Sequence, residues 1–260
     1  MFKIIRYSFL DILKSKLMLI YTAFFLLIGF GLLNFSSDLH KAIISMMNIL
    51  LLLVPLISTV FGVMYFYNSR EFVELLMCQP IERKDVFLGL YFGVSLSLSI
   101  SLFVGTLIPF MFYGLSVSGQ IFQFFNLMLI GVLLTFIFSI LSFLISVYNK
   151  DKIKGFGYAI LLLLYLSVIY DGMMLMVFVS FSDYPLENVA LALSILNPID
   201  LGRIAIVLKL DVAALMGYTG AVFNAFLGSM NGILLSIGSM ALWFFVPLFF
   251  YVKKINKRDF

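Results

Sequence analysis

Residues 121–147 read IFQFFNLMLIGVLLTFIFSILSFLISV and contain no charged side chain. An α-helix needs about 20 predominantly apolar residues to cross the hydrocarbon core of a bilayer, so this stretch is long enough to cross it once. It lacks the alternation of apolar and polar residues that is typical of a membrane β-barrel strand. The stretch therefore predicts a membrane-spanning helix.

Five other stretches share this length and apolar character: residues 17–35, 43–67, 87–113, 156–181 and 230–252. Hydrophobic residues make up 63% of the 260-residue chain and charged residues 12%, against roughly 45–50% and 25% in soluble domains. This composition excludes a water-soluble enzyme and a disordered chain. We expect an all-α polytopic membrane protein with six transmembrane helices in a single domain, residues 1–260. The first helix is too long for a cleavable signal and should remain as an anchor.

Basic residues gather beside alternate ends of the predicted helices. The side shared by both termini carries Lys3, Arg6, Lys14, Lys16, Arg70, Arg83, Lys84, Lys150, Lys152, Lys154, Lys253, Lys254, Lys257 and Arg258, out of 17 basic residues in the chain. The positive-inside rule makes this side cytoplasmic. We therefore expect a multi-pass protein of the bacterial cytoplasmic (inner) membrane with both termini in the cytoplasm.

Residues 1–16 precede the first span. Phe2, Ile5, Phe9, Ile12 and Leu13 fall on one side of a helix, and basic residues fall mostly on the other. A basic amphipathic helix of this kind lies in the membrane interface, so we predict an interfacial elbow helix. An ordinary positive flank of the first span is the alternative.

Residues 68–86 join the second and third spans and include SREFVELLMCQPIERKD. Charged residues surround a short apolar ridge, and Pro80 should end the first short helix because proline disfavours a helical conformation in the residue before it. Such a helix can lodge in a groove on another protein. A solvated linker is the alternative.

Residues 182–229 should lie on the outer side, and they exceed what a connection needs. Asp200 is a candidate helix cap before a short helix over residues 201–209, with further short apolar segments at 212–216 and 221–227. These segments would lie on the outer surface or dip into protein-shielded depth. Either they bind an outer partner, or they form a lid on the chain's own spans. The candidate docking residues are Asn197, Pro198, Asp200 and Arg203.

Asp171 is the one ionisable residue well inside a predicted span. Intramembrane acids are costly and are usually functional, although an acid near the outer interface can simply reach water. Met173 and Met174 follow, and thioethers bind soft ions such as Cu(I). Packing is the more ordinary use of methionine. Asp171, Met173 and Met174 are candidates for a translocation path, with no firm metal site.

Several motifs are absent from the sequence. There is no Walker A loop and no G-x-S-x-G nucleophile elbow, so the chain lacks these routes to nucleotide binding and hydrolysis. A single cysteine and a single histidine exclude a disulfide framework and a zinc-protease helix. We expect a non-catalytic chain that binds no nucleic acid and carries no cofactor of its own.

The six spans, the amphipathic N-terminal segment and the charged loop resemble the permease subunits of ABC-2 (type V exporter-like) transporters. In that family the loop forms a coupling helix on a cytoplasmic ATPase, which binds ATP and Mg. The resemblance implies a homodimer, because such machines need two ATPase sites. The residues that it assigns to ATPase coupling are Arg70, Glu71, Glu74, Leu75, Pro80 and Arg83.

A narrower resemblance rests on LNPIDLGRI at 196–204 and MGYTGAVF at 216–223. These segments are similar to the NosY permeases of nitrous-oxide reductase maturation transporters (NosDFY), although Gly202 stands where a bulkier residue is expected. The resemblance implies a NosF-like ATPase, a periplasmic NosD-like protein and a NosL-like copper-chaperone lipoprotein as partners, and a role in maturing copper sites. Three alternatives stay open: an ABC-2 exporter of another substrate, an ion-coupled secondary transporter using Asp171, and an anchoring scaffold without transport.

Overall fold

The structure is a computed structural model of the chain, and it describes residues 1–36, 38–115, 119–181, 192–207 and 230–257. The regular elements within these ranges are helices. In chain order they are α1 (Phe2–Leu13), α2 (Lys16–Phe35), α3 (Leu39–Asn68), α4 (Arg70–Met77), α5 (Arg83–Phe112), α6 (Ile121–Tyr148), α7 (Lys152–Leu164), the π-helix η1 (Tyr165–Ile169), α8 (Tyr170–Ser180), α10 (Pro198–Val207) and α12 (Met230–Lys257).

Six helical segments within the described residues are long and apolar enough to cross a membrane. They are α2, α3, α5, α6, the continuous segment α7–η1–α8, and the 236–256 part of α12. The prediction of an all-α membrane protein with six spans is confirmed. Most of these helices continue beyond the predicted apolar limits. At 1.5 Å per residue, the 30 residues of α3 and of α5 exceed the hydrocarbon thickness, so their ends reach into the polar flanks.

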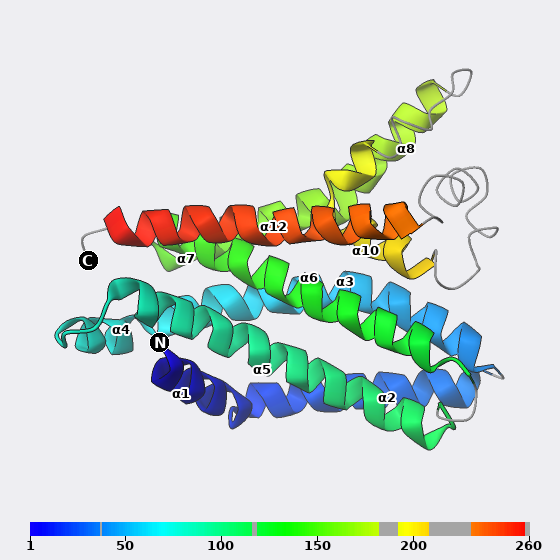
Figure 1. The fold of residues 1–260 in the computed structure, drawn as a ribbon, viewed down its shortest axis with the longest axis horizontal. Helices are drawn as coiled ribbons and strands as arrows, with labels where there is room; N and C mark the ends of the chain where they lie inside the picture. Colours follow the sequence, from blue (N-terminus) through cyan, green and yellow to red (C-terminus); the bar gives the residue numbers. More distant parts are fainter. Residues whose placement is uncertain (37, 116–118, 182–191, 208–229, 258–260) are drawn as a thin grey trace.

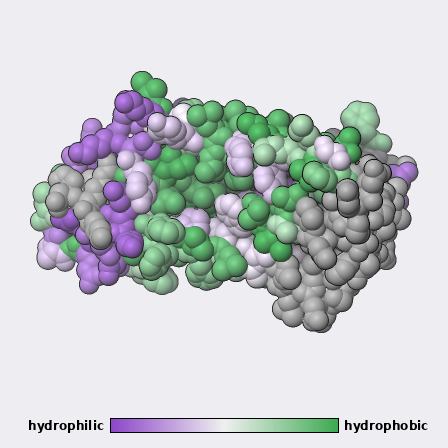
Figure 2. Space-filling model, turned by 90° about the horizontal axis from the view of Figure 1, so that it is seen from above, coloured by the Kyte–Doolittle hydropathy of each residue, from purple (hydrophilic) through white to green (hydrophobic). Residues whose placement is uncertain are grey.

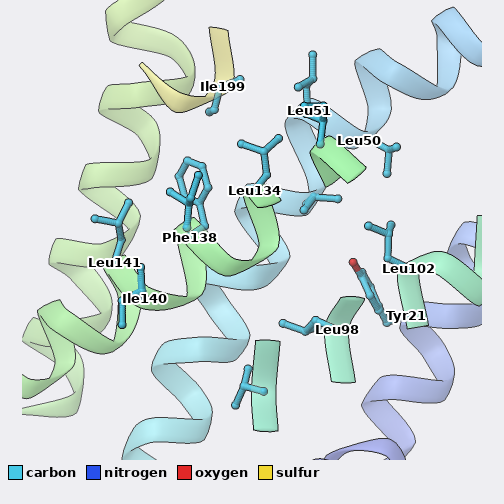
Figure 3. Packing of buried hydrophobic residues seen from close by; sticks show 14 of the residues in the cluster. Tyr21, Leu50, Leu51, Leu98, Leu102, Leu134, Phe138, Ile140, Leu141 and Ile199 are labelled. Atoms are coloured by element: carbon cyan, nitrogen blue, oxygen red, sulfur yellow. The ribbon is translucent and has the colours of Figure 1, made fainter. Parts of the chain in front are cut away.

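The spans differ greatly in how deeply they are buried. Within the apolar windows, 72% of α5 and 67% of α6 are buried, against 17% of the fifth span, α7–η1–α8. The core therefore lies where α3, α5 and α6 pack together, with Leu50, Leu98, Leu102 and Leu134 among its buried side chains (Figure 3). The fifth span leaves this core, and α8 projects away from the other helices (Figure 1).

Polar residues collect at one end of the molecule. The N-terminus, α1, α4 and the last turns of α12 lie together at this end (Figure 1), and hydrophilic residues gather over it beside a broad hydrophobic band (Figure 2). We call it the basic end. This arrangement agrees with a multi-pass membrane protein, and the assignment of the basic end to the cytoplasm stays a prediction.

Helix α1 packs on α5 through a face that overlaps the predicted apolar face and is shifted toward Ile4 and Ser8. The buried residues are Ile4, Ser8 and Ile12, whereas Phe2 is 86% exposed. The reason lies in α5, where a Cβ at Gly93 would lie 2.5 Å from Ser8 Cβ. The small residues on α5 admit the α1 backbone at Ser8, and this close approach shifts the buried face toward Ser8.

Candidate functional site

Helix α4 lies at the basic end between the second and third spans. Val73 is buried, whereas Glu71, Glu74, Leu75 and Cys78 are exposed. These four positions are spaced i, i+3, i+4 and i+7, so they form one stripe along the helix. The helix ends at Met77, ahead of Pro80, as predicted. The segment is thus an anchored amphipathic helix with an acidic and apolar outer stripe, and not an unstructured linker.

The residues predicted to contact an ATPase fall into two groups. Glu71, Glu74, Leu75, Pro80 and Arg83 are exposed at the basic end. Arg70 is partly buried, and its Nη2 donates to the Lys150 carbonyl at 2.6 Å. The structure therefore gives Arg70 an internal partner in the joint between α6 and α7. Its assignment to an ATPase contact stays a prediction.

Helix α10 reaches the middle of the bundle. A Cβ at Gly202 would lie 3.0 Å from Ile130 Cγ2 and 3.3 Å from Leu51 Cδ2. Ile199 lies over Leu134 and Phe138 of α6 (Figure 3). Leu51 and Leu134 stand near the midpoints of α3 and α6. Of the two placements predicted for this part of the outer segment, the structure has the one at depth, and glycine at 202 allows the close approach.

The N-terminus of α10 is capped by Asn197, and the prediction that Asp200 is the cap was wrong. The Asn197 Oδ1 accepts a hydrogen bond from the Ile199 amide at 3.1 Å, and Pro198 takes the first helical position. Proline suits that position because its missing N–H would have no intrahelical partner there. The helix thus starts earlier than predicted, and Asp200 lies within its first turn.

A partly buried ionic cluster joins α10 to the fifth span. Arg203 Nη1 donates to Asp200 Oδ1 at 3.0 Å, and its Nη2 donates to Asp171 Oδ2 at 3.3 Å. The side chain of Asp200 is 7% exposed, and those of Arg203 and Asp171 are 35% and 31% exposed. The Arg203 guanidinium therefore pairs with two carboxylates. Asp171, at position 20 of the 29-residue span Lys152–Ser180, is a paired acid.

Together with Asn197, the cluster holds α10 to the fifth span at two positions. Asn197 Nδ2 donates to Asp200 Oδ2 and to the Leu166 carbonyl, both at 2.9 Å. Leu166 belongs to η1, and Asp171 follows one π turn later in α8. π-Helical turns are rare in proteins, and those that occur are often found at functional sites. The span is therefore irregular where α10 binds it, and both ends of the irregular turn are held by the same helix.

The docking residues predicted on the outer face are used inside the chain. Asn197 and Asp200 bind each other, and Arg203 binds both acids. Residues outside the predicted set hold the same segment: Trp243 Nε1 donates to the Ile195 carbonyl and Asn126 Nδ2 to the Ala205 carbonyl, each at 3.1 Å. Binding of an outer partner by this set stays a prediction. The further short apolar segments predicted at 212–216 and 221–227 lie outside the described residues.

Met173 and Met176, which follow Asp171 in α8, face outward. Met173 is 55% exposed and Met176 72% exposed, because α8 departs from the bundle. Core packing, the more ordinary use of methionine, is therefore not the use of Met173 within this chain. Within the described part of the chain, no group of three or more His, Cys, Asp or Glu side chains could hold a metal ion. A path formed by Asp171, Met173 and Met174 stays a prediction.

Sequence reasoning missed the residues that hold the basic end together. The Tyr67 hydroxyl lies 3.0 Å from the Asn149 carbonyl oxygen and 3.2 Å from that of Asp151. Tyr7 of α1 stacks on Phe72 of α4 with ring centroids 5.0 Å apart. The N-terminal amine pairs with Asp85 at 2.9 Å. An aromatic residue at the end of an apolar span carries no signal that separates such a role from ordinary packing.

Comparison with known proteins adds no assignment: no protein-family model and no curated protein sequence matches this chain.

Proposed function

We propose that this chain is the transmembrane permease subunit of an ATP-driven ABC-2 transporter. The observation that carries the proposal is α4, a short helix at the basic end between the second and third spans. Its buried Val73 anchors the helix while Glu71, Glu74 and Leu75 present an exposed stripe. An exposed amphipathic helix on the cytoplasmic side is suited to a groove on a partner protein. In this proposal the partner is an ATPase that binds ATP and Mg.

The first experiment is purification of the tagged chain from its native membranes in mild detergent. An ABC ATPase should co-purify with the unmodified chain. Arg83→Glu and Glu74→Arg should each release the ATPase, because they reverse exposed charges at the proposed contact. Lys41→Glu changes the charge by the same amount as Arg83→Glu, near the start of α3 and so at the opposite end of that helix from α4, and should retain the ATPase. Release by all three variants would contradict docking at α4. Absence of any ATPase would favour the ion-coupled alternative.

The proposed topology has its own test in Cys78. It is the single cysteine of the chain, and it lies exposed just beyond α4. A membrane-impermeant maleimide should label it in inside-out vesicles and leave it unlabelled in right-side-out vesicles. The reverse pattern would place the basic end outside and would contradict both the positive-inside assignment and the site of ATPase binding.

A narrower proposal rests on sequence resemblance to NosY permeases. In it, the permease dimer couples ATP hydrolysis to transport, or to force on a periplasmic NosD-like protein, during copper-site maturation of nitrous-oxide reductase. A NosL-like lipoprotein would deliver copper. Deleting the chain should leave the reductase in the periplasm with depleted copper sites, as measured by metal analysis of the purified enzyme. Normal copper content would restrict the proposal to another ABC-2 substrate.

A further inference from the structure

Two side chains at the end of α3 and the start of α4 bind one short loop. The Tyr67 hydroxyl shares its proton between the carbonyls of Asn149 and Asp151, at 3.0 and 3.2 Å. Arg70 donates to the intervening carbonyl of Lys150 at 2.6 Å. Three successive carbonyls of the α6–α7 joint are therefore held by residues on either side of Ser69. We name residues 149–151 the joint.

Both sides of this contact are themselves fixed. The Arg70 guanidinium carbon lies 4.7 Å from the centroid of the Tyr67 ring, a cation–π distance. On the joint, the Asp151 side chain accepts from the Ile153 amide at 2.8 Å and caps α7. Lys152 Nζ adds a second link, to Asn68 Oδ1 at 3.0 Å. These hydrogen bonds link the end of α3 and the start of α4 directly to the joint and to the start of α7.

The position of Arg70 suits the electrostatics of the joint. Asn149 is the C-cap of α6. The last carbonyls of a helix lack intrahelical partners and carry its negative dipole end, so a cation is favoured beside them. Arg70 meets the chain one residue after that cap. The contact therefore has a physical basis apart from any ATPase.

Gly155 in the first turn of α7 makes room for the contact. A Cβ at this position would lie 2.0 Å from the Tyr67 hydroxyl oxygen and 2.8 Å from Cζ. Any other residue would push the Tyr67 ring away from the joint. Gly157, two residues later, has no atom within 4 Å of its Cβ position, so the same substitution there is harmless. The pair gives a test and its matched control on one helix.

We propose that Tyr67 and Arg70 form a clamp that makes the joint, and with it α7, move together with α4. The proposal rests on the proposed function for the source of motion, since an ATPase on α4 would supply it. In this proposal Tyr67 and Arg70 are positioning residues. It also identifies the fifth span as the element that receives the motion. This span has the smallest buried share of the six, at 17%, so the least packing within the described chain resists its displacement.

The clamp is tested first without any ATPase. Spin labels are placed on the native Cys78 and on Ile153→Cys, which is 81% exposed in the parent chain. Their distance distribution is measured by electron paramagnetic resonance in lipid nanodiscs. Tyr67→Phe removes the hydroxyl and keeps the ring beneath Arg70. Loss of this hydrogen bond should raise the released population roughly 2- to 10-fold, seen as a broader distribution.

Gly155→Ala tests the same contact from the other side. It should broaden the distribution as Tyr67→Phe does, whereas Gly157→Ala should reproduce the parent. Size-exclusion profiles identify a variant that fails to fold, and the remaining substitution still decides the outcome. Unchanged distributions in the folded variants would overturn the clamp.

Measurements of ATPase binding and of coupling distinguish the clamp from the proposed function. With an ATPase bound, Tyr67→Phe should retain co-purification but lose most of the transport or partner-stimulated ATP hydrolysis. Arg83→Glu should lose co-purification itself. If Tyr67→Phe keeps full coupling, the clamp is overturned and the permease proposal stands. If no ATPase binds any variant while the labels still report release, the permease proposal fails and the clamp stands.

Discussion

Arg203 is the residue on which the partly buried ionic cluster depends. Its two terminal nitrogens bind Asp200 at 3.0 Å and Asp171 at 3.3 Å, which would otherwise face each other without a cation. With both acids ionised, the three side chains carry one net negative charge. Removing one member of a buried pair costs more than the pair contributes, because a charge is left without its partner. Because the cluster already has an excess of negative charge, losing the cation should cost more stability than losing one acid.

Arg203→Gln should destabilise the protein more than Asp171→Asn. The first leaves two acids without a cation, whereas the second leaves Arg203 paired with Asp200 alone. Because Asp171 and Arg203 are about one-third exposed, the loss for Arg203→Gln should fall near the lower values for buried hydrogen-bonded charges, about 1–3 kcal/mol. Thermal unfolding in one detergent compares the variants. Lys41→Gln, which removes an exposed cation, is the control.

The double variant Arg203→Gln with Asp171→Asn sharpens this prediction. It should be more stable than Arg203→Gln alone, since one of the two opposed charges is gone. Equal melting temperatures for Arg203→Gln and the double variant would show that Asp171 does not repel Asp200 once Arg203 is removed, and would contradict this prediction.

At the scale of elements, α4 depends on one buried side chain. Val73 is 4% exposed, while Leu75 two residues later is 69% exposed. Val73→Ala removes two buried carbons and should weaken the docking of α4 by roughly 1–2 kcal/mol. Hydrogen exchange of the α4 amides should quicken accordingly. The expected measurement is faster exchange confined to residues 70–77.

Leu75→Ala is the matched change for Val73→Ala. It should leave hydrogen exchange in α4 unchanged, because the side chain contributes little buried area to the fold. It should still weaken ATPase co-purification if the exposed stripe is the proposed contact. Faster exchange in Leu75→Ala, or unchanged exchange in Val73→Ala, would show that the buried face of α4 is assigned wrongly.

The spans were predictable from sequence because bilayer thickness sets their length directly. Residues 121–147, for example, begin at the first residue of α6 and end one residue before its last residue, Tyr148. Helix α4 was predictable because Pro80 and the mixed charges around an apolar ridge are local signals. Neither inference needed to know which helices are neighbours.

The depth of α10 and the clamp were not predictable, because both depend on tertiary neighbours. Asn197 finds the Leu166 carbonyl 31 residues away, and Tyr67 finds the joint more than 80 residues away. The π turn at residues 165–169 has no sequence signature that distinguishes it from the helix around it. The shift of the buried face of α1 toward Ser8 was not predicted for the same reason, since Gly93 on α5 admits Ser8 at close range.

At the scale of the whole molecule, the fifth span is the exposed element. It has 17% of its apolar window buried, and α8 projects from the bundle. Lipid tails are as apolar as leucine, so exposure alone does not require a protein partner. Small residues do favour close helix packing in a bilayer. Gly172 is exposed in α8, with no atom within 4 Å of its Cβ position, and so offers a second copy a place of close approach.

The proposed homodimer should therefore form through α8. In a Cys78→Ser background, Met176→Cys should give a dimer-sized band on oxidation in membranes, because this side chain is 72% exposed. Leu27 in α2 is 73% exposed, and the Leu27→Cys variant should stay monomeric under the same oxidation. Gly172→Leu should abolish the Met176→Cys band by blocking close approach, whereas Gly31→Leu, also open around its Cβ position, should not. Cross-linking through Leu27→Cys alone would place the interface on α2, and monomers throughout would contradict a dimer.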